Sequence, residues 1–327
     1  RNRKPLIDTN KIVPDGPTIS TNFGEKAQNR TYQDLLKNKF DEHNFEQLST
    51  STIYKVSIDG SVKKWMDDGM YRTISFSPNG EYVMISKINK PFSYLVTYSR
   101  FPTETNVYTK DGDFVSNLQK VSLIEELPKG FMSVRTGKRS FSWRPDKGAS
   151  LTYVTALDSG DPSKKVDFRD EVYELNYPFL GQGKSILKTI NRFSRIDWAT
   201  KDMAIAYDTW WNTRNRKSYV FNPSNPNIKP KIISDRNYQD IYSDPGVFIS
   251  SKNKFNRSVL KMHYGNIYLT GQGFSPNGQF PFIDKINTKT FKKTRIYQSS
   301  YTDKIENIID YDPKKNQLTV SIESPSE

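Results

Sequence analysis

The sequence contains no cysteine and only two histidines, His43 and His263. Without cysteine, neither a disulfide nor a thiolate site for zinc or an iron–sulfur cluster can form. The two histidines lie far apart in the sequence, so they do not suggest a histidine-rich metal site. We therefore predict that the chain binds no metal and no cofactor.

Long apolar runs are also missing. No stretch approaches the run of about 18 apolar residues that a membrane-spanning helix needs, so we predict no membrane partner. Arg1 opens a polar segment that is unlike a signal peptide. A chain that begins at Arg rather than Met is expected to have lost a preceding part. The compartment stays open, with a periplasmic or secreted bacterial location favoured.

The pentapeptide Gly-x-Ser-x-Gly, which exposes the nucleophile of α/β-hydrolases on a sharp turn, does not occur in these 327 residues. A general base could only be His43, in a predicted helix, or His263, on a predicted strand, and both are interpreted as structural. Gly183-Lys184-Ser185 resembles the end of a phosphate-binding loop, but Pro178 occupies the place of the first glycine. We predict no catalytic residue in this chain.

Acidic residues are outnumbered, since 49 Lys and Arg against 36 Asp and Glu give a net charge of +13. A basic surface attracts anions such as nucleic acid, acidic lipid head groups and acidic peptides. No block of consecutive basic residues forms a nucleic-acid-binding arm, so a solvated basic face is the simpler interpretation. We predict no nucleic-acid partner. An anion or nucleic-acid binder stays as the weakest alternative, and its binding would weaken steeply with salt.

Aromatic residues are plentiful, with 19 Tyr, 19 Phe and 5 Trp, and they suit half-buried strands. Residues 1–30 are interrupted by Pro and Gly and are predicted as loop. One or two short helices are expected within 31–48, with Thr31 and Asp34 loosely matching a capping box. From Ile53 onward strands alternate with turns, and Asp59-Gly60 and Asp111-Gly112 predict type I′ hairpins.

One unit recurs along the chain. An aromatic residue ends a strand, a polar turn rich in Pro, Asp, Asn or Gly follows, and then an apolar strand begins. The copies occupy 74–85, 141–154, 196–207 and, in degenerate form, 309–320. Repetition at about 40–60 residues is typical of the four-stranded blades of a propeller. A further likeness, Gly273–Gly278, precedes a proline and is interpreted as a loop inside a blade.

The repeats predict an all-β fold: a β-propeller of four-stranded blades over 51–327, after a loop and short helical insert over 1–50. Four full blades are expected near 73–118, 139–190, 193–234 and 240–299, with half-blades at 51–65 and 305–327. Because soluble proteins avoid unpaired strand edges, this open arc is expected to be part of a larger closed propeller. The missing blades would come most simply from more of the same polypeptide.

Four segments carry a family resemblance from about Pro14 to the C-terminus. They are Arg30–Asn38, Ile85–Phe101, Arg139–Lys147 and Tyr242–Gly246. In these segments the chain resembles glutamyl endopeptidases, which are prolyl-oligopeptidase-type serine peptidases of bacteria and chloroplasts. The resemblance implies that the chain is the later part of an N-terminal propeller, with the α/β-hydrolase domain and its Ser-Asp-His triad absent.

The same resemblance implies a gating and substrate-selecting domain of a peptidase that cleaves after Glu. The implied partners are a peptide or unfolded-protein substrate, the α/β-hydrolase domain of the same polypeptide and the missing blades. A stand-alone propeller that serves as a protein-interaction platform stays open, because a fold does not fix a function. A reading frame that continues into a Gly-x-Ser-x-Gly domain would distinguish the two.

Arginine and aromatic residues are the remaining candidates for a site. Guanidinium groups form paired hydrogen bonds with carboxylates, and aromatic rings supply rigid apolar walls, so together they suit acidic peptide side chains. Ordinary packing within a blade is the alternative, with Trp210 and Trp211 on opposite faces of one strand. The predicted substrate-binding residues are Arg100, Arg192, Arg195, Trp210, Trp211, Arg214 and Arg216.

Overall fold

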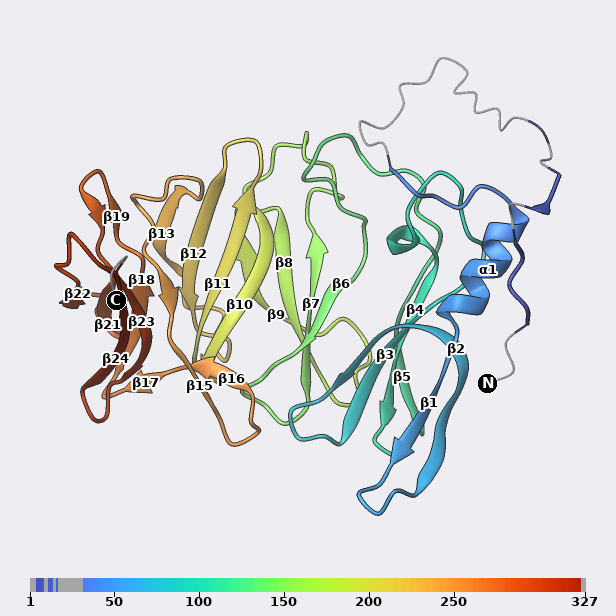
Figure 1. Ribbon diagram of the computed structural model, residues 1–327, viewed down its shortest axis with the longest axis horizontal. Helices are drawn as coiled ribbons and strands as arrows, with labels where there is room; N and C mark the ends of the chain where they lie inside the picture. The colour runs from blue at the N-terminus through green and yellow to red at the C-terminus, as the bar shows by residue number, and fades with distance from the viewer. Residues whose placement is uncertain (1–3, 9–10, 14–15, 17–31, 325–327) are drawn as a thin grey trace. The chain divides into compact units, whose positions relative to one another are not determined.

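A computed structural model describes residues 4–8, 11–13, 16 and 32–324 of the chain (Figure 1). Its elements begin with helix α1 (Lys39–Ser49) and continue almost entirely as antiparallel strands. The chain forms two compact units. Unit 1 comprises Arg1–Trp143, Gly148–Lys165 and Glu174–Lys184, and unit 2 comprises Arg144–Lys147, Val166–Tyr173 and Ser185–Glu327.

The first sheet has five strands in sequence order. They are β1 (Ser51–Val56), β2 (Val62–Phe76), β3 (Tyr82–Ile88), β4 (Thr103–Thr109) and β5 (Phe114–Val121). The long strand β2 pairs with β1 through its first half, up to Gly69, and with β3 from Met70 onward. The expected half-blade at 51–65 is therefore not separate. It shares one strand with the first full blade, because β2 runs unbroken through Asp68-Gly69, which forms no turn here.

Two further sheets are four-stranded and follow sequence order. The second contains β6 (Arg139–Trp143), β7 (Ser150–Ala156), β8 (Asp170–Asn176) and β9 (Lys184–Thr189). The third contains β10 (Arg192–Thr200), β11 (Met203–Trp210), β12 (Asn215–Phe221) and β13 (Lys231–Asn237). Up-and-down order within a sheet is the topology of a propeller blade, and both sheets match the predicted spans.

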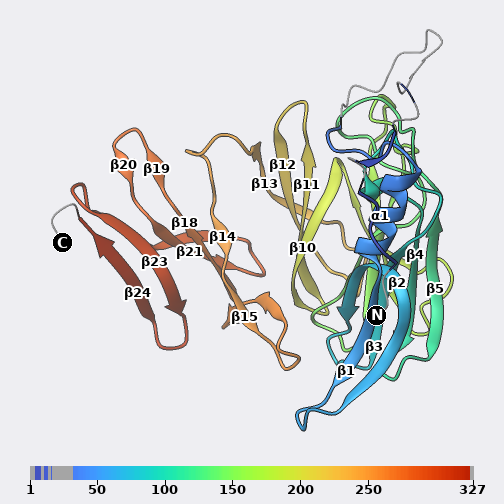
Figure 2. The same ribbon diagram turned by 45° about the vertical axis from the view of Figure 1, so that its right-hand side comes forward.

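The fourth sheet contains insertions. Its strand order is β14-β18-β21-β22, and β17 also pairs with β18; Figure 2 labels β14, β18 and β21 of this sheet. The bounds are β14 (Val247–Phe248), β17 (Met262–His263), β18 (Asn266–Gly271), β21 (Phe282–Asn287) and β22 (Lys293–Gln298). Three hairpins accompany it: β15 (Ser250–Lys252) with β16 (Ser258–Leu260), β19 (Phe274–Ser275) with β20 (Gly278–Gln279), and β23 (Ile305–Asp312) with β24 (Gln317–Glu323).

These sheets confirm the predicted all-β fold of four-stranded blades. The segment 273–278 is an insertion inside the fourth blade, as expected, and takes the form of the β19–β20 hairpin between β18 and β21. The hairpin β23–β24 matches the half-blade predicted at 305–327.

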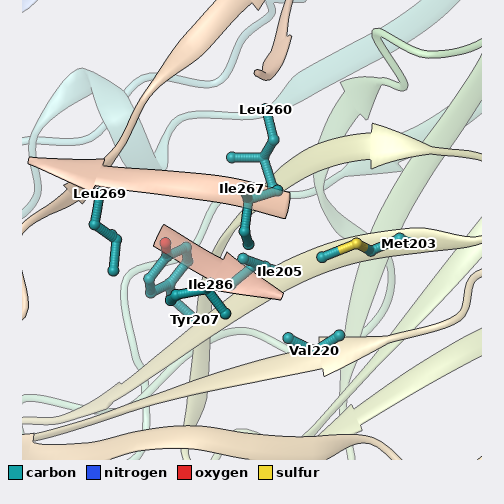
Figure 3. Close-up of a cluster of buried hydrophobic side chains, with 8 residues drawn as sticks. All are labelled: Met203, Ile205, Tyr207, Val220, Leu260, Ile267, Leu269 and Ile286. Carbon is teal, nitrogen blue, oxygen red and sulfur yellow. The ribbon is translucent and has the colours of Figure 1, made fainter. Parts of the chain in front are cut away.

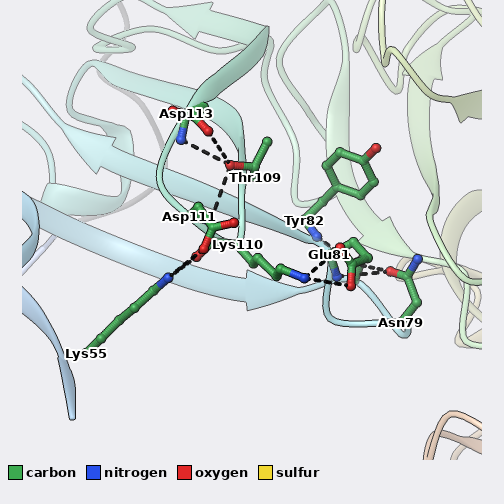
Figure 4. Close-up of polar contacts among 9 residues, drawn as sticks. Lys55, Asn79, Glu81, Tyr82, Thr109, Lys110, Asp111 and Asp113 are labelled. Atoms are coloured by element: carbon green, nitrogen blue, oxygen red, sulfur yellow. Dashed lines mark hydrogen bonds and ion pairs between the residues drawn. The ribbon is translucent and has the colours of Figure 1, made fainter. Parts of the chain in front are cut away.

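The two Asp-Gly turns form hairpins, but not of the predicted type. Only Gly60 and Gly112 have positive φ, of 84° and 104°, whereas a type I′ turn requires positive φ at both central residues. The amides of Gly60 and Gly112 donate to the carbonyls of Ser57 and Thr109. Both are thus three-residue loops ending in a glycine bulge. Around the second, Thr109 and Asp113 hold the turn and Lys110 pairs with Glu81 (Figure 4).

Helix α1 begins later than the sequence suggested. Asn38 is its N-cap, and the Asn38 side chain accepts hydrogen bonds from the amides of Phe40 and Asp41. Asp34 has a φ of 55° and lies before the helix, whereas Thr31 lies outside the described residues. The expected helix start near residue 31 is therefore wrong, because Asn38 provides the better cap. No helix among the described residues has the length and apolar character needed to cross a membrane.

Each unit has its own apolar core. In unit 1, Phe45 of α1 packs edge-on against Phe92 and Phe101, within a cluster that includes Met70 and Ile88. In unit 2, side chains of the third blade meet side chains of the fourth (Figure 3). That cluster consists of Met203, Ile205, Tyr207, Val220, Leu260, Ile267, Leu269 and Ile286.

Candidate functional site

The predicted residue Arg192 is part of a buried ion pair. Its Nη1 lies 3.1 Å from Oδ1 of Asp170, and the two side chains are 4% and 0% exposed. The same nitrogen donates to the carbonyl of Arg169, and Asp170 also accepts from the amide of Phe193. Such a pair is held in one geometry and has little freedom to bind a ligand. These contacts indicate that Arg192 fixes the start of β10 in position.

Arg195 and Arg216 lie farther along the same blade, each against an aromatic ring. The Arg195 guanidinium lies 4.0 Å from the ring centre of Tyr207, and its Nε donates to Asp197 at 3.3 Å. The Arg216 guanidinium lies 5.5 Å from the ring centre of Tyr238. Contacts of this kind contribute about 0.5–1 kcal/mol at exposed positions. They engage two of the guanidinium groups that the sequence suggested for a ligand.

The alternative interpretation expected Trp210 and Trp211 on opposite faces of one strand, but the two residues do not share a strand. Trp210 ends β11, whereas Trp211 begins the turn that leads to β12. The Arg169 guanidinium stacks 4.0 Å from the Trp210 ring, and the Arg214 guanidinium stacks 3.8 Å from the Trp211 ring. Arg214 also donates to the carbonyl of Trp211, with its backbone at a φ of 54°. It therefore belongs to the turn between β11 and β12.

Arg100 is separate from the other predicted residues, because it belongs to unit 1 and they belong to unit 2. It ends the short 3₁₀ helix η2 (Tyr98–Arg100), is 9% exposed, and lies 5.5 Å from the ring centre of Tyr32. Its carbonyl accepts from the amide of Ile124. The other six residues come from the third blade.

Next to the Arg and Trp residues, the third blade contains a polar network that sequence reasoning missed. The buried Asp208 carboxylate accepts from the amide and side chain of Asn191 and from the Tyr219 hydroxyl. Burial raises the pKa of Asp208, an effect that these hydrogen bonds partly oppose. Asn215 donates to Asp235, which also pairs with Lys217. These contacts satisfy the groups from within, so the network stabilises the blade.

A different group of arginines lines a cavity of about 370 Å³ in unit 1. Arg72 comes from β2, Arg139 from the first residue of β6, and Arg135 from the loop before β6. The lining described for this cavity contains no Asp or Glu. The rest of the lining is Thr73, Met84, Ser86, Ser99, Phe101, Thr103, Thr105, Gln119, Val121, Ile124, Ser140 and Phe141.

The floor of this cavity is one cross-strand row of the first blade. Thr73 pairs with Ser86, Ser86 with Thr105, and Thr105 with Gln119, so these side chains share a face of the sheet. The Thr105 hydroxyl donates to the Ser86 hydroxyl at 3.2 Å. Arg135 donates from Nη2 to Gln119 Oε1 at 2.7 Å. The row thus fixes the guanidinium of Arg135 above the sheet.

The electrostatics of the cavity favour anions. Burial, and secondarily the charge of Arg139, lower the pKa of Arg135, although a guanidinium stays protonated at any ordinary pH. Arg72 donates to a neutral acceptor, the carbonyl of Ser99, at 3.4 Å. Arg72 and Arg135 therefore hydrogen-bond to neutral oxygens, which leave their positive charge in place.

Sequence reasoning named none of these three arginines as a site residue. Arg139 stood in the segment Arg139–Lys147 that carried the family resemblance, which was the one available signal. Arg72 is distant in the sequence, and only strand pairing places it beside the others. No cluster of three or more His, Asp or Glu suited to a metal ion occurs in the part of the chain that the structure describes.

Comparison with known proteins gives two related sequences. A probable chloroplastic glutamyl endopeptidase of Oryza sativa subsp. japonica is 37% identical over 305 residues, which cover 91% of this chain and 32% of the relative. The Arabidopsis thaliana protein with the same description is 33% identical over 307 residues, with the same coverage. This chain is a homologue of the glutamyl endopeptidases. It spans about a third of the length of these curated relatives, and no family model matches it.

Among solved structures, this chain resembles several proteins at low sequence identity. The β-propeller domain of the trilobed protease from Pyrococcus furiosus has a TM-score of 0.39 at 12% identity, covering 79% of this chain and 70% of that one. Pyrococcus horikoshii acylaminoacyl peptidase has a TM-score of 0.40 at 11% identity, covering 76% and 35%. An oligogalacturonate lyase in complex with manganese has a TM-score of 0.41 at 11% identity, covering 78% and 61%.

Proposed function

We propose that this chain is the propeller portion of a serine peptidase of the glutamyl endopeptidase kind. Its role would be to restrict access to the active site and to select peptide substrates. The observation that carries the proposal is the sequence identity of 33–37% to probable glutamyl endopeptidases across nine-tenths of the chain. The blades recognised from the repeats fit a domain that surrounds an entrance rather than one that performs chemistry.

The catalytic serine, aspartate and histidine would lie outside these 327 residues. The sequence contains no Gly-x-Ser-x-Gly turn. His43 Nε2 lies 3.1 Å from the Pro5 carbonyl, and the ring of His263 lies against Tyr264. These surroundings support structural roles for both histidines. Partners of this portion would be an α/β-hydrolase domain and further blades of the same polypeptide, together with a peptide or unfolded-protein substrate.

The proposal is tested on the protein isolated from its native source. Its intact mass is measured beside cleavage of a fluorogenic peptide containing Glu, with a Gln peptide of the same sequence as the control. We expect a mass well above 37.9 kDa and cleavage of the Glu peptide that a serine-directed inhibitor abolishes. A mass near 37.9 kDa without cleavage would contradict the proposal and favour a stand-alone interaction platform.

A further inference from the structure

The cavity lined by Arg72, Arg135 and Arg139 has the composition of an anion site. Three arginines from three separate segments line one space, and none of its described lining residues is acidic. Guanidinium groups are the preferred partners of carboxylates, because their planar fork matches the two oxygens. A volume of about 370 Å³ suits a side chain or a chain end, but not a folded partner.

The polar floor and the apolar walls of the cavity serve different parts of such a ligand. Thr73, Ser86, Thr105 and Gln119 lie in one row, in which the hydroxyls of Thr73 and Ser86 and the amide of Gln119 can donate to carboxylate oxygens, whereas the Thr105 hydroxyl donates to Ser86. Met84, Phe101, Val121, Ile124 and Phe141 supply apolar surface. A short aliphatic chain ending in a carboxylate would contact both kinds of surface.

A neighbouring, larger cavity gives the ligand room for its remaining residues. It measures about 740 Å³ and shares Gln119, Val121, Ile124 and Arg135 with the arginine cavity. Its other lining residues come mainly from the segments 118–128 and 134–138, which beyond Val121 carry backbone polar groups outside regular strands. Glu125 and Glu126 belong to this larger cavity alone. The uncompensated positive charge therefore concentrates in the smaller, arginine-lined cavity.

We propose that the cavity of Arg72, Arg135 and Arg139 binds a carboxylate of a peptide. The source is either an acidic side chain within the peptide or the carboxylate at its C-terminus, and both present the same group to the arginines. The peptide as the ligand rests on the proposed function, whereas the affinity for a carboxylate rests on the cavity alone. Such a site would hold a substrate away from the scissile bond and add to selection by charge.

The test is isothermal titration calorimetry with the full-length protein after its catalytic serine has been blocked covalently. Four ligands are compared: an N-acetylated, C-terminally amidated peptide with one internal Glu, the same peptide with Gln, the Gln peptide with a free C-terminal carboxylate, and glutarate. Binding of the Glu peptide should be about tenfold or more tighter than that of the amidated Gln peptide, as expected for a charge-assisted hydrogen bond. Preferred binding of the free-carboxylate Gln peptide would assign the site to chain ends instead.

Three variants that each remove one positive charge locate the site. Arg135→Gln and Arg72→Gln should each weaken binding of the carboxylate about tenfold, whereas Arg195→Gln should change it less than about twofold, because Arg195 does not line the cavity. Arg72→Gln guards against a folding defect of Arg135→Gln, because among the described residues Arg72 makes only a long hydrogen bond, to Ser99. Thermal melting of each variant checks that it folds.

The outcomes separate the two proposals. Equal binding of all three peptides together with no Arg135-dependent binding of glutarate, or an equal loss with Arg195→Gln, would overturn the carboxylate site. If the unblocked wild-type protein still cleaves the Glu peptide in that case, the proposed peptidase function stands. If no peptide is cleaved or bound but glutarate binds in an Arg135-dependent manner, the site stands and the peptide substrate is wrong.

Discussion

Arginines cluster in two places, the cavity over the first blade and the third blade, but they are held differently. In the third blade, Arg192 is paired with buried Asp170, and Arg195 is paired with Asp197 over the ring of Tyr207. In the cavity, Arg72 of the first blade and Arg135 of the loop before β6 donate to neutral oxygens, and the described lining has no acid. The difference teaches that arginine density indicates a binding site only where the surrounding sheet leaves the charge uncompensated.

The largest expected effect follows from removing the buried ion pair between Arg192 and Asp170. Asp170→Ala leaves the guanidinium of Arg192 buried and without its carboxylate, so the free energy of unfolding should fall by about 3–5 kcal/mol. Urea unfolding followed by tryptophan fluorescence measures the change. The matched substitution in the first blade, Arg72→Ala at an exposed position, should cost no more than about 0.5 kcal/mol. Similar losses for the two variants would contradict the distinction between the blades.

A core substitution shows whether the third and fourth blades of unit 2 share one core. Ile205→Ala removes a fully buried side chain from the cluster formed with Ile267 and Ile286 (Figure 3). We expect a loss of about 2–4 kcal/mol in the free energy of unfolding. Thermal and urea unfolding provide the readout, with Ile232→Ala, a half-exposed position of β13, as a control that should cost much less. Equal costs would show that the cluster is not a core.

A smaller effect is expected where Arg214 stacks on Trp211. The half-exposed Trp211 carries a contact worth about 0.5–1 kcal/mol, so Trp211→Ala should lower stability by about that amount. The substitution should leave carboxylate binding unchanged, because Trp211 does not line the cavity of Arg72, Arg135 and Arg139. Melting temperature and calorimetry are measured on the same sample. A loss of carboxylate binding in the Trp211→Ala variant would indicate that the third blade binds the carboxylate.

The smallest effect depends on pH. A hydrogen bond from Lys217, and then one from Asn215, lower the pKa of Asp235 below its ordinary value of 3.8. A carboxyl whose pKa is depressed by folding contributes stability above pH 3.8, and that contribution disappears as the pH falls through the folded pKa. Asp235→Asn should therefore cost under about 1 kcal/mol at pH 7.

The pH series that checks this prediction compares wild type and Asp235→Asn at pH 7, 5, 4 and 3. The difference between their urea midpoints should be constant at the upper two values and shrink toward zero at the lowest. A difference that grows on acidification would show that the pKa of Asp235 is raised by folding, contrary to its contacts with Lys217 and Asn215.

Much of the fold could be predicted from sequence, because blades repeat a local signal. An aromatic residue such as Trp143 or Trp198, followed by a polar turn and an apolar strand, marks the same place in successive sheets. The turn type was missed, since Asp-Gly suits both a two-residue turn and a three-residue loop whose glycine forms the bulge. Helix α1 was placed too early because Asn38, a strong cap, was passed over for Thr31.

The site was harder to predict, because it depends on pairing between distant strands. Arg192 and Arg195 stood out as neighbours in sequence, yet Asp170 of β8 and Asp197 of the same strand β10 neutralise them in the folded chain. Arg72 and Arg135 are far apart in sequence, and only the row from Thr73 to Gln119 brings them to one cavity. Local composition therefore located the arginines but did not reveal which of them keep an uncompensated charge.

The most direct test of this comparison is a crystal structure of the full-length protein with glutarate bound. A carboxylate is expected among Arg72, Arg135 and Arg139, within hydrogen-bond distance of at least two of the guanidinium groups. The account would be contradicted if glutarate lay instead beside Arg195, Arg214 or Arg216 in the third blade, with the cavity of the first blade holding only water.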